Sequence, residues 1–130
     1  MSDTATKTNI AQVGVVAIPV SDQEKALAFY RDQLGFETRR DAAFGPGMRW
    51  IEVAPPGSAT TIALEPARDD RPVGVDTGIR LYTADPEADH DGLLGRGVDA
   101  DAELLRFPGV PAMFSFRDQD GNRLVIVGGE

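Results

Sequence analysis

The chain has 130 residues, and 21 acidic residues against 13 lysines and arginines give it a formal net charge of −8. This length suits one domain, or two small modules that share a core. The acidic balance argues against a nucleic-acid partner, because no basic stripe offsets the repulsion from phosphates. The sequence has no cysteine, which excludes disulfides, thiolate metal sites and cysteine nucleophiles.

The composition also argues against a membrane partner. No apolar run approaches the roughly 20 residues that a membrane span requires. Residues 1–9 are polar and lack the apolar centre of a signal peptide, so we expect a short mobile tail on a cytoplasmic protein. An acidic protein of this kind would tolerate or attract a cationic small molecule.

The most regular stretch begins with residues 13–20, an apolar run rich in β-branched residues that predicts a buried strand. Ser21 and Glu24 follow with the spacing of a capping box, which predicts a helix start at Ser21. The helix carries an apolar stripe of Leu27, Tyr30 and Leu34. Gly35 then ends the helix, because a left-handed residue is favoured there.

Shorter elements complete the first half of the chain. We expect a short strand over residues 36–40, a loop over 41–47, and a hairpin of strands 48–53 and 60–65 joined by a turn at 54–59. Residues 66–75 are charged, contain two prolines and show no periodicity, so they are predicted to be a linker.

The same pattern then restarts. Residues 77–83 predict a strand, Asp85 and Pro86 a helix start, and residues 87–96 a helix that Gly97 ends. Strands are expected at 101–106, 112–117 and 123–127, with a loop at 107–111 and a tight turn at 118–122. The order is βαβββ twice, in one domain: module one over about 10–66, a linker at 67–75, and module two over about 76–127.

Two segments carry a family resemblance: VSDQEKALAFYRDQLGF at residues 20–36 and FRDQDGNRLVIV at residues 116–127. With the repeat between Thr77 and Val98, they resemble the vicinal oxygen chelate superfamily of glyoxalases, extradiol dioxygenases and bleomycin- and fosfomycin-resistance proteins. The resemblance spans most of residues 13–127. It implies an α+β fold in which two βαβββ modules form a cupped half-barrel around a cavity, and it implies a homodimer.

The resemblance also locates the metal ligands of the metal-dependent members, which lie on the first and last strands of each module. The corresponding positions here are Val15, Gly78, Val125 and a residue within 61–64. Valine and glycine have no side-chain donor for a divalent cation. We therefore expect no metal, no cofactor and no catalytic residue.

Other residues leave an enzymatic alternative open. Glu52 and Glu65 form a carboxylate pair that is able to bind an atypical metal or share acid–base work. The alternative is therefore a glyoxalase-like lyase or isomerase, or a dioxygenase. His90, the sole histidine, is interpreted as a solvated residue of the polar second helix. A third possibility, a partner-binding domain, has no sequence feature in its favour beyond the family's tendency to pair.

Period-two alternation predicts which side chains line the cup. Three rows face it: Val13, Val15 and Ala17; Gly78, Arg80 and Tyr82; Arg123, Val125 and Val127. The neighbouring residues Val16, Ile18, Ile79, Leu81, Leu124 and Ile126 pack toward the helices.

Aromatic residues gather in the predicted rim and walls of the cup, and about half of them are expected to be core residues. The predicted ligand-binding residues are Val15, Phe44, Met48, Trp50, Arg80, Tyr82, Phe107, Phe114 and Val125. A mostly apolar pocket with a few polar groups suits a flat, drug-sized molecule. The sequence thus predicts a protein that sequesters an aromatic or cationic natural product such as an antibiotic, without metal chemistry, as in antibiotic resistance.

Overall fold

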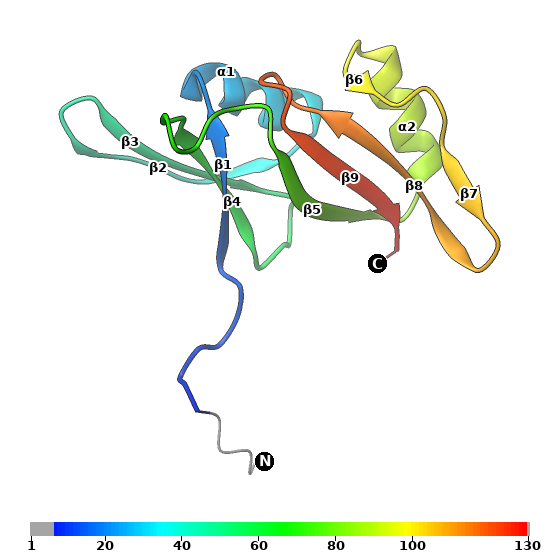
Figure 1. Cartoon of the computed structure of the whole chain (residues 1–130), viewed down its shortest axis with the longest axis horizontal. Helices are drawn as coiled ribbons and strands as arrows, with labels where there is room; N and C mark the ends of the chain where they lie inside the picture. The colour runs from blue at the N-terminus through cyan, green and yellow to red at the C-terminus, as the bar shows by residue number, and fades with distance from the viewer. Residues whose placement is uncertain (1–6, 130) are drawn as a thin grey trace.

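The computed structural model describes residues 7–129 and confirms an α+β fold with two sheets (Figure 1); the first module is βαβββ as predicted, and the second has one further short strand after its helix. The first module contains β1 (Val15–Val20), α1 (Gln23–Ala28), a π-helical turn η1 (Phe29–Gln33), β2 (Glu37–Gly45), β3 (Met48–Ala54) and β4 (Thr61–Pro66). The second contains β5 (Asp76–Thr83), α2 (Pro86–Gly95), β6 (Asp99–Ala100), β7 (Leu105–Phe107), β8 (Val110–Arg117) and β9 (Arg123–Gly128). Residues 1–6 of the predicted tail lie outside the described part.

The two modules have matching sheets. The first has the strand order β1-β4-β3-β2 and the second β5-β9-β8-β6, with β7 paired to β8. In each sheet the module's first strand runs parallel to its last strand, and the remaining neighbours are antiparallel. The hairpins β2–β3 and β7–β8 extend at opposite ends of the molecule, and residues 7–14 project away from both sheets (Figure 1).

One hydrophobic core joins the helix-facing sides of both sheets. Ile18 and Ile51 from module one and Phe116 and Leu124 from module two are completely buried in it. The ring of Phe29 stacks on that of Phe116 with centroids 6.4 Å apart, which brings η1 against β8. The prediction of which strand residues pack toward the helices is largely confirmed. Ile18, Leu124 and Ile126 are buried, and Ile79 and Leu81 pack against the same core. The opposite faces of the two sheets therefore point outward.

Both helices end as predicted, but the first begins one residue later than expected. Gly35 and Gly97 adopt φ angles of +76° and +82°, the left-handed conformation that glycine tolerates best. The cap of α1 is Asp22, whose Oδ1 accepts hydrogen bonds from the backbone N–H groups of Glu24 and Lys25. The prediction of a Ser21 cap is wrong because Ser21 Oγ instead donates to Asp120 Oδ1 at 2.6 Å, in the other module.

Buried polar groups of the β8–β9 turn hold the modules together. The fully buried Asn122 donates from Nδ2 to the carbonyl of Pro19, 2.9 Å away. Its Oδ1 accepts from the backbone N–H groups of Gly74 and Val75. The end of β1, the linker and β9 are thus tied to one side chain.

Tyr30 makes a second bond across the module boundary. Its hydroxyl donates to Asp118 Oδ2 at 2.7 Å from a completely buried position. Burial, and then the nearby carboxylate of Asp118, raises the pKa of Tyr30 well above its usual 10.0. The phenol therefore stays a neutral hydrogen-bond donor.

Three further predictions need correction. The expected loop at 41–47 is mostly strand, because β2 pairs with β3 as far as Gly45. The expected strand at 101–106 is replaced by two short strands, β6 and β7, and β8 begins at Val110, inside the expected loop. His90 is buried rather than solvated: its Nε2 lies 2.7 Å from the carbonyl oxygen of Asp101.

No helical segment in the described chain is long and apolar enough to cross a membrane.

Candidate functional site

Three of the predicted ligand residues meet in one pocket at the β2–β3 hairpin. Phe44, Met48 and Trp50 line a cavity of about 300 Å³, which Glu65 and Arg68 border on β4 and the segment after it. Phe44 and Met48 are 62% and 51% exposed, so the pocket is open to solvent. The hairpin brings these side chains together because β2 folds back on β3 with Ala42 opposite Trp50.

The indole of Trp50 is fixed by a carboxylate on the same strand face. Trp50 Nε1 donates to Glu52 Oε2 at 2.6 Å, and Thr61 Oγ1 donates to Glu52 Oε1 at 2.7 Å. These bonds, that of Trp50 first, hold the pKa of Glu52 below its usual 4.5. The side chain is therefore ionised at neutral pH, and its hydrogen bonds are charge-assisted. The only sequence signal for this contact is the i, i+2 spacing of Trp50 and Glu52 on one strand.

The hairpin that carries the pocket is anchored to the first helix. Arg49 contacts Glu24 Oε1 at 2.6 Å from Nη1 and Asp41 Oδ2 at 2.8 Å from Nη2. Gln23 Nε2 donates to the backbone carbonyls of Arg49 and Leu64. These contacts tie β3 to both α1 and β2, so the pocket rests on a supported hairpin. Sequence reasoning missed them, because their partners come from distant segments.

Arg80 and Tyr82 lie in a different place, beside a groove of about 480 Å³ between the modules. Val16 and Ile62 line it from the first sheet, and Ile79 and Leu81 line it from the second. Tyr82 is 70% exposed, and within the described part of the chain Arg80 Nη1 donates only to the carbonyl of Gly78, at 3.1 Å. The two residues therefore share a surface with each other but not with Trp50.

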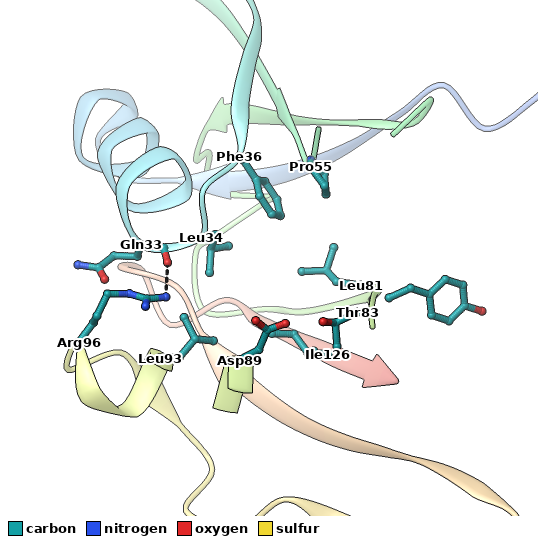
Figure 2. Close-up of a pocket in the computed structure, with 11 residues that line it drawn as sticks. Gln33, Leu34, Phe36, Pro55, Leu81, Thr83, Asp89, Leu93, Arg96 and Ile126 are labelled. Carbon is teal, nitrogen blue, oxygen red and sulfur yellow. Dashed lines mark hydrogen bonds between the residues drawn. The ribbon is translucent and has the colours of Figure 1, made fainter. Parts of the chain in front are cut away.

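A smaller pocket of about 200 Å³ adjoins this groove and shares Pro55, Leu81 and Tyr82 with it. Figure 2 shows its apolar side chains, which come from the segment after η1, from the loop after β3, from α2 and from β5 and β9. Asp89 and Arg96 of α2 supply its charged groups. No residue of this pocket except Tyr82 was predicted to bind a ligand.

The remaining predicted residues are dispersed. Val15 is 43% exposed on the outer face of β1, and Phe107 is 55% exposed on β7. Val125 and Phe114 are 4% and 1% exposed. Phe114 packs edge-on against His90 with ring centroids 4.7 Å apart, so in this structure it is a core residue and not a pocket wall.

The sequence and the fold both match known proteins. The model of the glyoxalase/bleomycin resistance protein/dioxygenase superfamily matches residues 12–126. The chain belongs to this superfamily. Among curated proteins, it is 29% identical over 123 residues to YetH of Bacillus subtilis (strain 168), an uncharacterized protein, covering 90% of this chain and 98% of YetH.

Two solved structures of superfamily type are similar over almost the whole chain. A superfamily member from Sphaerobacter thermophilus DSM 20745 has 40% identity and a TM-score of 0.86, covering 92% of this chain and 98% of its own. TnmS3, an antibiotic-binding protein from Streptomyces sp. CB03234, has 34% identity and a TM-score of 0.83, covering 95% of this chain and 99% of its own.

At the positions that the family resemblance assigned to metal ligands, the chain has Val15, Gly78 and Val125. Val15 and Val125 have no donor atom. Gly78 adopts a φ of +73°, a conformation that a histidine or glutamate would adopt only with strain. Within residues 7–129, no three histidine, aspartate or glutamate side chains come together as a metal-binding group. Glu52 is already engaged by Trp50 and Thr61.

Proposed function

We propose that the protein is a small-molecule binding protein that holds a flat, cationic aromatic compound, such as an antibiotic, against Trp50 without metal chemistry. The observation that carries this proposal is the hydrogen-bonded indole of Trp50 within the pocket that also contains Phe44 and Met48. A fixed aromatic face binds a planar ring at a low entropic cost, because little side-chain freedom remains to be lost. The likeness to the antibiotic-binding protein TnmS3 supports the same class of ligand.

The charges around the pocket favour a cation. Glu65 lines the pocket, and no hydrogen bond or ion pair engages its carboxylate among the described residues. Arg68, the neighbouring cation, is paired with Asp70 at 3.2 Å. A cationic ring over an indole gains further attraction from the negative face of the aromatic system. The net charge of −8 favours the same sign of ligand.

We further propose that a second copy of the chain completes the binding site. The outer sheet faces and hairpins carry apolar side chains that the single chain leaves open, including Val15 at 43%, Phe44 at 62% and Phe107 at 55% exposure. A second copy that covers such side chains would remove them from water, which favours association. We also propose that the protein acts in the cytoplasm, where sequestration lowers the free concentration of a toxic compound; its lack of cysteines fits a reducing compartment.

The sole tryptophan provides a direct test, because the fluorescence of Trp50 reports on its own pocket. Titration with proflavine, a planar cation, should quench this fluorescence saturably, with a dissociation constant well below millimolar. An acridine carboxylate of the same ring size should bind more weakly. Calorimetry should show weaker proflavine binding for Trp50→Ala but not for the control Leu94→Ala, which alters an exposed apolar residue of α2.

Two results would count against the proposal. Proflavine binding that is equally strong in Trp50→Ala and wild type would remove the indole from the site. Stoichiometric zinc, nickel, manganese or iron in protein purified without chelator would instead favour a metal enzyme.

A further inference from the structure

We propose that the pocket of Figure 2 is a second ligand site, separate from Trp50, and that it takes an organic ammonium ion carrying a single aromatic ring. The pocket lies at the edge of the hydrophobic core that the two modules share, where Phe36, Leu93 and Ile126 form part of its wall. It draws residues from both modules, so it exists only because the modules pack against each other. This proposal does not depend on the function proposed for the Trp50 pocket.

The apolar part of the pocket sets the size of the ligand. Leu34, Phe36, Leu81, Leu93 and Ile126 line a volume of about 200 Å³. An apolar cavity of about 150 Å³ is large enough to hold benzene. The pocket therefore has space for one ring and a short arm, and it shares Leu81 and Tyr82 with the larger groove.

The polar part of the pocket sets the sign of the ligand's charge. The carboxylate of Asp89 points toward Leu81 and Thr83 in Figure 2 and has no hydrogen-bond or ion-pair partner within residues 7–129. Thr83 lines the same pocket, and among the described residues its Oγ1 accepts only from the backbone N–H of Asp85, at 3.2 Å, so it retains a free lone pair. An ammonium group needs three acceptors, and these two side chains offer oxygen atoms on one side of the pocket.

Arg96 is the one cationic side chain that lines the pocket, and it is already engaged. Its Nη2 donates to the backbone carbonyl of Gln33 at 2.8 Å, which holds the guanidinium at the η1 end (Figure 2). The other N–H groups of the guanidinium lie at that same end of the pocket, so an anionic ligand would bind there, whereas a cation would bind at the free carboxylate of Asp89 (Figure 2). Asp89 favours a cationic ligand and Arg96 an anionic one, so two ligands that differ only in the sign of their charge can distinguish the two possibilities.

The test uses phenethylammonium and hydrocinnamate, which share a ring and a two-carbon arm but carry opposite charges. Each is titrated into the full-length, isotope-labelled protein while amide resonances are followed by NMR. We expect phenethylammonium to shift amides of α2 and β5 saturably and to bind more tightly than hydrocinnamate. Asp89→Asn should weaken phenethylammonium binding about three- to fivefold, the effect of losing one partly exposed charge pair.

The control Asp91→Asn makes the same charge change at an exposed position of α2 that does not line the pocket, and it should bind like the wild type. The single indole N–H resonance of Trp50 separates this site from the other one. Shifts confined to Trp50 and its hairpin, equal binding by both asparagine variants, or tighter binding of hydrocinnamate would each overturn the proposal. Failure of proflavine to bind at Trp50 would leave it standing.

Discussion

Replacing Glu52 with alanine should release the indole of Trp50. The variant removes an ionised acceptor that receives bonds of 2.6 Å from Trp50 and 2.7 Å from Thr61. Bonds to charged groups contribute about 1.5–3 kcal/mol when buried, and Glu52 is only half-buried, so we expect a loss of about 1–2 kcal/mol of folding stability. A ligand that stacks on Trp50 must then order the freed side chain, at a cost of about 0.5–1.5 kcal/mol, which weakens binding roughly two- to tenfold.

The conservative variant Glu52→Gln supplies the matched control. Its carbonyl oxygen can accept from Trp50, and its NH₂ group can donate to Thr61 Oγ1, because a hydroxyl also accepts. The geometry should survive, and proflavine affinity should stay within about twofold of the wild type. Calorimetry measures the affinities, and near-ultraviolet circular dichroism of the sole tryptophan reports its order. Wild-type affinity and an unchanged spectrum in Glu52→Ala would show that packing alone holds the indole.

Three further outcomes are expected. Tyr30→Phe removes the buried hydrogen bond to Asp118 and should lower the free energy of unfolding by about 1–3 kcal/mol, or the melting temperature by roughly 3–10 °C. The control Tyr82→Phe, at the exposed surface, should change neither quantity. The pKa of Glu52 is below 4.5 in the folded protein, so its contribution to folding stability is present above pH 4.5 and is lost as the pH falls through the lowered pKa. The fluorescence of Trp50 should therefore change in that acid range and not between pH 5 and 8. Val15→Glu places a charge on the bare face of β1 and should give a folded monomer in sedimentation experiments, whereas a dimer of unchanged stability would contradict the proposed interface.

Local chemistry made much of the fold predictable. The apolar run of β1, the stripe on the first helix and the glycines at 35 and 97 each determine an element within a few residues. The errors arose where a distant partner decides the outcome. Ser21 and Asp22 are adjacent and both are good caps, but Asp120, which is 99 residues away, binds Ser21 and leaves the cap to Asp22.

The candidate site was predictable to the extent that it lies within one hairpin. Phe44, Met48 and Trp50 come together because β2 and β3 are adjacent strands, which the sequence pattern indicates. Arg80 and Tyr82 belong to the other module, and no local pattern specifies how two modules pack. His90 shows the same limit: a histidine among acidic residues suggests a solvated position, but the carbonyl of Asp101 makes its burial acceptable.

The bonds of Asn122 also bear on how the chain folds. They connect it to Pro19, which lies 103 residues earlier, and to the linker nearly 50 residues earlier. Contacts of such sequence separation form slowly, because the intervening chain must lose its freedom first. During synthesis, β1 and α1 leave the ribosome long before Asn122 does, so module one must wait without its final partner. We expect refolding monitored at Trp50 to follow the same slow rate as a probe placed in β9, because neither module reaches its native packing alone.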